Sequence, residues 1–250
     1  MSIAERKERE KEQRRNDIIN AAEKLFFSRG YDNVSMDDIA KDVELNKATL
    51  YLYFKNKEAL YFTIVLSGVR ILNSLVKDNV AKAGTGSEKL WEIGHAYFSF
   101  VKRYSDYNRV YNYFYSGRFN LTDLINVDEF QMLSAHDSPV KAWKNADMAA
   151  NRANHEVAKQ IIELNNEIFV ITRESISAGI EEGTFRANLD PGEAAVVFML
   201  LIESIPNMRP DLRKGLDERG IDHLQFSRDL GNYINHMFMV KATPGKNKRN

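Results

Sequence analysis

The 250-residue sequence contains no cysteine, and this absence removes several kinds of chemistry at once. Without thiols the chain has no disulfides, no thiolate metal ligands and no cysteine nucleophile. A cysteine-free chain suits the reducing cytoplasm, where we expect the protein to reside.

Long apolar runs are also missing. The longest one, AAVVFMLLI at residues 194–202, has nine residues, whereas a helix needs roughly 20 to cross a bilayer. The N-terminal sequence MSIAERKEREKEQRRND is densely charged and lacks the apolar core of a secretory signal. We therefore expect a soluble protein with no membrane partner. Since 35 basic and 35 acidic side chains balance, total charge argues neither for nor against nucleic acid.

Motifs for catalysis and metal binding are absent too. The five histidines show no HExxH or paired metal spacing, no GK[ST] follows the GTGS at residues 84–87, and there is no GxSxG elbow. The acidic pairs Asp37-Asp38 and Glu181-Glu182 lie at expected helix ends, where we interpret them as capping and solvated groups. The sequence gives no support to an enzyme, and we expect no catalytic residues, no metal and no cofactor.

Helical periodicity dominates what is present, with only 5 prolines and no convincing strand pattern. One helix is predicted to end at Arg29, and SMDDIAKDV predicts a second that Ser35 and Asp38 cap reciprocally. A third is predicted over residues 47–53 with Asn46 as its N-cap, and a longer one begins after Asn56. Three helices in about 40 residues, the last two short and joined by a tight turn, match a helix-turn-helix unit.

Beyond residue 80 the pattern remains helical. KAGTGSEK at residues 82–89 is predicted to be a loop, and residues 121–152 to be loops and short helices. Longer helices are predicted over residues 90–104, 155–182 and 222–240, with another that begins at Pro191. The basic tail, residues 241–250, is predicted to be disordered. The fold class is therefore all-α.

Residues 35–60, SMDDIAKDVELNKATLYLYFKNKEAL, resemble the DNA-binding segment of TetR-type (TetR/AcrR) transcriptional regulators. Ile39-Ala40, Tyr51, Tyr53-Phe54, Lys57-Glu58 and Leu60 stand at the family's spacing, and the similarity covers about residues 14–62. It implies a DNA-binding helix-turn-helix domain over residues 1–56. A larger helical domain for effector binding and dimerisation would occupy residues 57–240.

The third helix would enter the major groove with its N-terminal end toward the base edges, and helix N-termini favour phosphate. By resemblance, the tyrosine hydroxyls, Ser35 and Lys57 would lie near the DNA backbone. The predicted DNA-binding residues are Ser35, Asn46, Lys47, Thr49, Leu50, Tyr51, Tyr53 and Lys57. For Leu50, Tyr51 and Phe54 the alternative is plain core packing, and Tyr51 could both pack its ring and offer its hydroxyl.

Two features depart from the family pattern. Glu44 stands in the turn where the family usually has glycine, which allows a different backbone conformation there. Residues 1–62 also contain twelve basic and twelve acidic side chains, so any positive potential must come from their arrangement. Arg14 and Arg15 are candidates for an N-terminal arm on DNA or for a solvated helix start.

GIEEGTFRANLDP, residues 179–191, resembles the link that precedes the family's last helices, which form a four-helix bundle between two subunits. The following AAVVFMLLIESI is apolar nearly all round and must be buried on several sides. We expect it to be shared between the subunit's core and a dimer partner, with burial inside one subunit as the alternative. The predicted interface residues are Phe198, Leu201, Ile202, Ile205, Leu230, Tyr233 and Met237.

Eleven aromatic side chains lie between Trp91 and Phe119. They could form an ordinary core, or an apolar cavity whose phenols orient an aromatic or hydrophobic effector. The predicted pocket residues are Tyr97, Phe100, Tyr104, Tyr111 and Phe114.

The resemblance implies a ligand-responsive regulator, most simply a repressor that binds a palindromic operator as a homodimer and is released by a small hydrophobic or aromatic effector. Two alternatives remain open at this point. One is a non-enzymatic small-molecule binding protein with a vestigial helix-turn-helix, and the other is a DNA binder that no effector controls.

Overall fold

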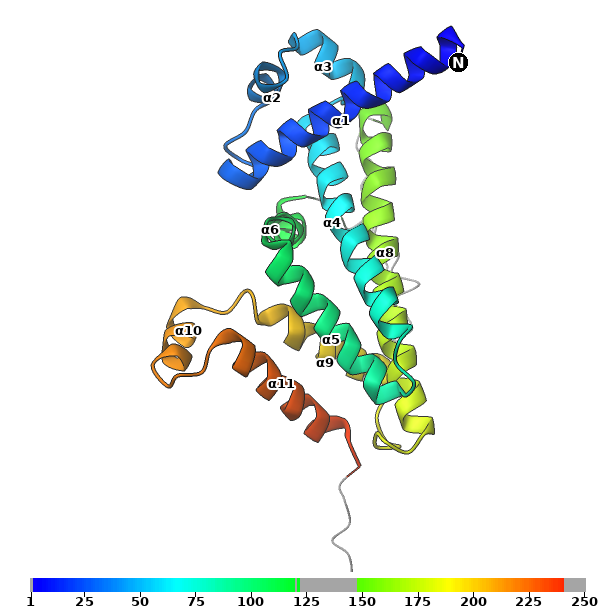
Figure 1. Ribbon diagram of the computed structural model, residues 1–250, viewed down its shortest axis with the longest axis vertical. Helices are drawn as coiled ribbons and strands as arrows, with labels where there is room; N and C mark the ends of the chain where they lie inside the picture. The colour runs from blue at the N-terminus through cyan, green and yellow to red at the C-terminus, as the bar shows by residue number, and fades with distance from the viewer. Residues whose placement is uncertain (1, 120, 122–147, 241–250) are drawn as a thin grey trace, which may run out of the picture. The chain divides into compact units, whose positions relative to one another are not determined.

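A computed structural model describes residues 2–119, 121 and 148–240 of the chain (Figure 1). In these ranges the structure is helical, with no strands beyond one isolated bridge between Phe185 and Met239, so the all-α prediction is confirmed. The helices are α1 (Ile3–Arg29), α2 (Met36–Asp42), α3 (Lys47–Tyr53), α4 (Lys57–Val80), α5 (Gly86–Arg103), α6 (Ser105–Tyr113), the π-helical turn η1 (Phe114–Arg118), α8 (Met148–Glu181), α9 (Pro191–Ser204), α10 (Pro210–Asp217) and α11 (His223–Phe238).

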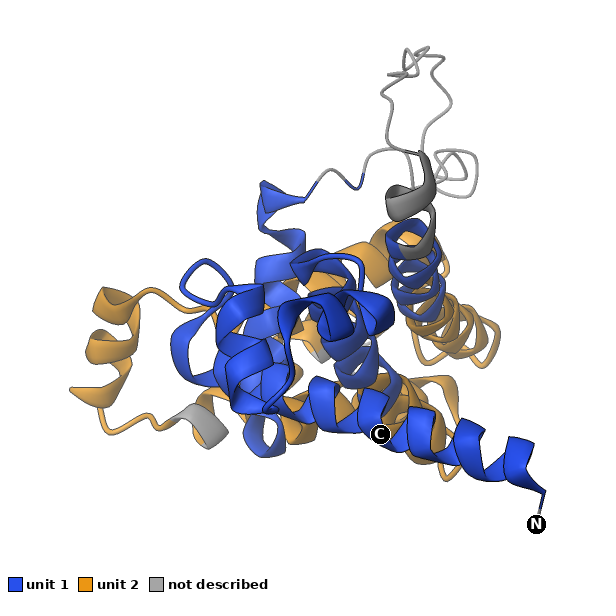
Figure 2. Cartoon of the chain, turned by 90° about the horizontal axis from the view of Figure 1, so that it is seen from above, with its two compact units in different colours: residues 1–71, 102–165 blue, residues 72–101, 166–250 orange. Residues whose placement is uncertain are grey.

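The chain forms two compact units, each made of two stretches of sequence (Figure 2). Unit 1 comprises residues 1–71 and 102–165, and unit 2 comprises residues 72–101 and 166–250. The predicted domain boundaries at residues 56 and 240 stay proposals, and the predicted tail, residues 241–250, lies outside the described residues.

The core of unit 1 forms because α1, α2, α3 and the first half of α4 each turn an apolar stripe inward. Phe26 of α1 packs edge-on against Tyr61 of α4, with ring centroids 5.3 Å apart, and both side chains are almost completely buried. The Tyr61 hydroxyl donates to the Val110 carbonyl at 3.0 Å, which satisfies the polar tip of a buried ring. Full burial of an apolar side chain of this size stabilises by about 1.5–3 kcal/mol, so this core fixes the helices that carry the site.

The predicted caps account for the short helices. Ser35 and Asp38 form the predicted capping box of α2, and Asn46 caps α3. Asn56 accepts from the Ala59 amide at 2.8 Å at the start of α4. Each of these side chains satisfies an amide that the helix leaves free, so these predictions are confirmed.

Two helices begin earlier than predicted. The predicted loop at residues 82–89 is wrong in its second half, because α5 already begins at Gly86. The Glu88 carboxylate accepts from the Gly84 and Thr85 amides at 2.9 and 3.0 Å, and this capping permits the early start. Helix α8 begins at Met148 instead of residue 155, consistent with the good helix formers in MAANRA.

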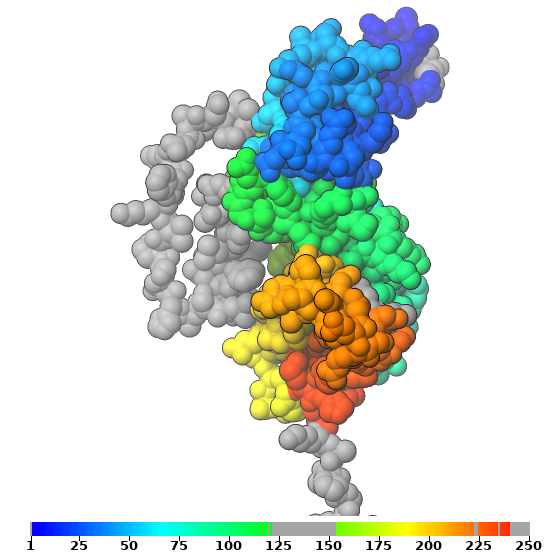
Figure 3. Space-filling view, turned by 90° about the vertical axis from the view of Figure 1, so that its left-hand side faces the viewer, coloured from blue at the N-terminus to red at the C-terminus, as the bar shows by residue number. Residues whose placement is uncertain are grey.

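Unit 2 is built on residues 72–80 of α4 and residues 166–181 of α8, together with most of α5 and with α9 and α11. Lys77 of α4 and Glu167 of α8 pair at 2.7 Å, while the Phe185 ring contacts Phe238 at the end of α11. Helix α10 has no buried side chains and lies on the surface (Figure 3). The remaining helices enclose the core of this unit.

Helix α4 is long and apolar enough, by length and composition alone, to cross a membrane. Its most apolar window is 61% buried inside the protein. That burial is typical of a core helix.

Candidate functional site

The turn between α2 and α3 sets the direction in which α3 leaves the domain. Glu44 lies in this turn with φ of 54°, the left-handed conformation that usually favours glycine. The expectation of a different backbone conformation at Glu44 is therefore wrong: the glutamate adopts the conformation that glycine would take. Asn46 then starts α3, and its Oδ1 accepts from the Thr49 amide and hydroxyl at 2.8 and 2.9 Å.

Lys47 is the first residue of α3 and is exposed. Its Nζ lies 2.8 Å from Asp37 Oδ1 and donates to Asp37 Oδ2 at 3.1 Å. The hydrogen bond that Lys47 donates to Asp37, and then the charge of Asp37, raise the pKa of Lys47. The cation at the N-terminal end of α3 is therefore paired with a carboxylate of α2.

Other predicted contacts are available to a ligand to different degrees. Asn46 and Ser35 are exposed, whereas Thr49, Tyr51 and Tyr53 are half-buried. Their use on DNA stays a proposal.

Leu50 does not belong to this surface. Its side chain is 0% exposed in the core of unit 1, so the prediction that it contacts DNA is wrong. The sequence pattern contained the reason, because Leu50 lies on the inward face of a two-turn helix whose burial holds it to α1 and α2.

Lys57 occupies a different setting from Lys47. Its Nζ donates to the Tyr31 carbonyl at 2.9 Å and lies 4.1 Å from the centroid of the Tyr31 ring. Partial burial lowers the pKa of Lys57. It fixes the start of α4 against the corner after α1, and its proposed phosphate contact would have to compete with this carbonyl.

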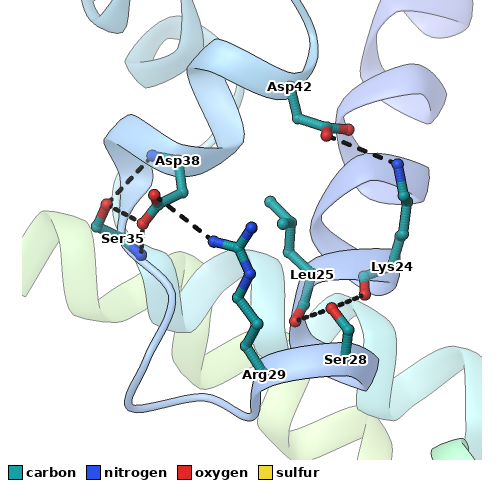
Figure 4. Close-up of polar contacts among 7 residues, drawn as sticks. All are labelled: Lys24, Leu25, Ser28, Arg29, Ser35, Asp38 and Asp42. Atoms are coloured by element: carbon teal, nitrogen blue, oxygen red, sulfur yellow. Dashed lines mark hydrogen bonds and ion pairs between the residues drawn. The ribbon is translucent and has the colours of Figure 1, made fainter.

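Ion pairs that the sequence analysis did not predict join α2 to α1 (Figure 4). Lys24 lies 3.7 Å from Asp42, and Arg29 lies 3.8 Å from Asp38. Exposed pairs of this kind contribute about 0–1 kcal/mol each. Their larger effect is on charge, since they engage carboxylates of α2 beside the proposed DNA surface.

The capping box of α2 should make part of the stability of unit 1 depend on pH. The side-chain hydrogen bond from Ser35 and then its backbone amide lower the pKa of Asp38 below the ordinary 3.8. A lowered folded-state pKa means that this contribution is present above pH 3.8 and is lost as the pH falls through the lower value.

We expect Ser35→Ala to lower the free energy of unfolding by about 1 kcal/mol at pH 7, and by less near pH 3. Urea unfolding of wild type and variant at both pH values measures this. The control is Ser28→Ala, whose hydroxyl donates only to carbonyls of α1 (Figure 4). A Ser35→Ala effect that is as large at pH 3 as at pH 7 would contradict the role of the Asp38 carboxylate.

Unit 2 contains an apolar cavity of about 220 Å³ between α5, α9 and α11. Of the five predicted pocket residues, Tyr97 lines it. Phe100 is buried in α5 without lining this cavity, and Tyr104 and Tyr111 belong to unit 1. Phe114 is 0% exposed and packs edge-on against Phe62 in the core of unit 1, so its prediction as a pocket residue is wrong.

Several of the predicted interface residues line this cavity. Phe198, Ile202 and Ile205 are buried and line it, so little of their surface is left for a second subunit to cover, and their place in an interface stays a proposal. Leu230 is half-buried and lines the cavity too, and Leu201 is half-buried.

The exposed apolar side chains of α9 and α11 lie at other positions. Of the predicted interface residues, Tyr233 is 65% exposed and Met237 is exposed; Val197 and the 63% exposed Leu200, which were not among the predicted residues, are exposed as well. An all-apolar helix such as α9 gives no periodic signal to separate its inner and outer faces. Their role in an interface stays a proposal.

These features define a helix-turn-helix protein: two short capped helices, a left-handed turn, and a second helix whose polar N-terminal end is exposed. Residues 18–64 match the family model described as "Bacterial regulatory proteins, tetR family". The helix-turn-helix segment of the chain therefore has the sequence pattern of bacterial regulatory proteins of the tetR family.

The sequence similarity to curated proteins is confined to part of the chain. The biofilm operon icaADBC HTH-type negative transcriptional regulator IcaR of Staphylococcus aureus (strain Newman) is 36% identical over 76 residues, which are 30% of this chain and 41% of that protein. The chain thus matches about two fifths of that relative's length.

Solved structures resemble the chain over most of its length. A tetR-family regulatory protein from Rhodococcus RHA1 has a TM-score of 0.61 at 17% identity and covers 92% of this chain and 98% of its own. AibR in complex with isovaleryl coenzyme A and operator DNA has a TM-score of 0.55 at 20% identity, with 90% and 98% covered. At these identities the similarity concerns the fold alone.

Proposed function

We propose that the protein is a repressor that binds a palindromic operator as a homodimer through α3 and is released by a small hydrophobic or aromatic effector. The observation that carries the proposal is the exposed N-terminal end of α3, where Asn46, Lys47 and Thr49 follow the left-handed turn at Glu44. Donors at that end of a major-groove helix are placed to meet base edges and phosphates.

The comparisons support repression, operator binding and effector control by analogy. IcaR is named as a negative regulator, and AibR was solved with operator DNA and an acyl coenzyme A. FadR of Bacillus subtilis, at 17% identity, was solved with stearoyl-CoA. Repression and effector control are therefore consistent with the fold, and we place the protein in the cytoplasm and outside the enzymes.

Dimerisation is supported by the exposed apolar side chains on α9 and α11. Val197 and Leu200 follow each other at a spacing of three residues on α9, and Tyr233 and Met237 at four residues on α11. Each pair forms a stripe on one face of its helix. Two recognition helices about 34 Å apart would read two half-sites of one operator.

The test is fluorescence anisotropy of the purified wild-type protein with a duplex from upstream of its own gene and with a scrambled duplex, at two salt concentrations. We expect tight binding to the first duplex, weak binding to the second, and a fall in both affinities with salt. Equal weak binding to both duplexes, repeated with a tiled set of upstream duplexes, would favour a vestigial helix-turn-helix on a small-molecule binding protein. Specific binding that no ligand changes would favour an effector-independent DNA binder.

A further inference from the structure

The cavity of unit 2 combines an apolar wall with one unsatisfied polar group. Tyr97 is 6% exposed and lines the cavity, and its hydroxyl has no hydrogen-bond partner among the described residues. A buried polar group without a partner is destabilising, so a group that supplies the missing hydrogen bond is favoured in this cavity. Three buried apolar side chains of α9 and the turn after it face the same space: Phe198, Ile202 and Ile205.

The chemistry around Tyr97 limits what that group can be. Burial, and then the charge of Glu203, raise the pKa of the Tyr97 phenol, so the phenol stays protonated and donates its hydrogen. Glu203 is itself partly buried, and its carboxylate opposes a second anion nearby. His95 and Arg228 also line the cavity but are exposed, and Arg228 already donates to Gln225 Oε1 at 2.8 Å.

We propose that this cavity binds a small, uncharged, mostly apolar molecule that carries one acceptor oxygen, such as a ketone or an ester, and that the Tyr97 hydroxyl donates to that oxygen. The inference rests on the proposed function in one respect, because it names the chemical class of the effector. The occupant is a free small molecule and not a side chain of a second subunit, since the Tyr97 hydroxyl that it has to reach is buried.

Two residues make the cavity experimentally accessible. Trp91 lines it and is 45% exposed, and Trp91 and Trp143 are the two tryptophans of the chain, so a Trp143→Phe background reports on Trp91 alone. Gly94 also lines the cavity, and a Cβ there would meet Phe198 at an ordinary contact distance of 3.6 Å. A side chain added at Gly94 therefore enters the cavity without displacing backbone.

The experiment uses three probes that share one carbon skeleton: indane, 1-indanone and indane-1-carboxylate. Each is titrated into the full-length protein by calorimetry and followed by Trp91 emission. We expect 1-indanone to bind about two- to tenfold more tightly than indane, the range for one net hydrogen bond, and the carboxylate to bind most weakly. In Tyr97→Phe the ketone and the hydrocarbon should bind within about twofold of each other.

Gly94→Leu should abolish binding of all three probes, and Gly94→Ala, which adds only the Cβ, should weaken it. The inference is overturned if Tyr97→Phe leaves the ketone preference unchanged, if filling at Gly94 leaves binding unchanged, or if no probe binds the wild type. It is also overturned if Gly94→Leu dissociates a dimer while ketone binding persists, because the cavity would then hold a partner's side chain.

Operator binding of the same wild-type preparation separates this inference from the proposed function. A protein that binds its operator but none of the probes contradicts the cavity assignment alone. One that binds the ketone through Tyr97 but no duplex specifically contradicts the proposed function alone.

Discussion

Gly86→Ala should destabilise unit 2 by about 3 kcal/mol, the upper part of the range for an overpacked core. A methyl group at this position would overlap the Gly179 amide nitrogen and the Ser175 carbonyl oxygen of α8. Both are backbone atoms in the last two turns of α8, so relief requires α5 and α8 to move apart. For a chain of this length the expected fall in Tm is about 6–12 °C.

Thermal and urea unfolding of the purified variant measure this effect. Gly215→Ala is the matched control, because the same methyl group in α10 meets nothing within 4 Å. Alanine is the better helix former there by up to about 1 kcal/mol, so its Tm should be equal to or above that of the wild type. Equal unfolding midpoints for the two variants would contradict the close approach of α5 and α8.

Asp37→Asn should strengthen DNA binding, and Lys47→Ala should weaken it. In the free protein Asp37 holds Lys47 at 2.8 Å, so phosphate has to displace a carboxylate before Lys47 can bind it. Removal of that carboxylate frees the Lys47 ammonium. It also removes the repulsion in water between one negative charge on the protein and a DNA phosphate, so the affinity for DNA should rise roughly fivefold at low salt. Each phosphate contact that Lys47 makes contributes about 0.9 to the slope of log K against log salt.

Asp37→Asn should raise the affinities for the operator and the scrambled duplex by similar factors, so the ratio of the two affinities should not increase. Lys47→Ala should lower the affinity about five- to tenfold and flatten the salt slope by about one. Anisotropy titrations over a range of salt concentrations provide all of these values.

A double-mutant cycle tells whether Asp37 acts through Lys47. If it does, Asp37→Asn should gain less in the Lys47→Ala background than in the wild type. Asp42→Asn is the control, because it removes the same charge from α2 but from a carboxylate that pairs with Lys24 of α1 (Figure 4). Equal gains for Asp37→Asn in both backgrounds would show a general charge effect and contradict the specific competition.

Local chemistry made the first third of the fold predictable. The caps at Ser35, Asn46 and Asn56 depend on side chains within three residues of the amides they bind, so sequence spacing is sufficient to find them. The start of α5 was missed because its capping group, Glu88, lies inside the segment whose glycines had suggested a loop.

The cavity lining and the proposed interface were less predictable, because they depend on which side chains of an apolar helix face inward and which face outward. Phe198 and Leu200 are two residues apart on α9, yet the first is 4% exposed and the second 63%. Composition cannot separate them, since both are large and apolar. The aromatic cluster posed the same problem, because Tyr97 lines the cavity of unit 2 whereas Phe114 fills the core of unit 1.

The divided sequence of unit 1 limits how operator specificity can be exchanged between related regulators. Helix α1 and the corner after it are held from α6: the Tyr107 hydroxyl donates to Glu23 at 2.6 Å, and the Tyr113 hydroxyl donates to Asp32 at 2.7 Å. A gene fusion at residue 56 would join this DNA-reading segment to a foreign α6 that lacks these phenols. Chimeric regulators, and natural recombinants, should therefore keep their stability only when both stretches of unit 1, residues 1–71 and 102–165, come from the same parent gene.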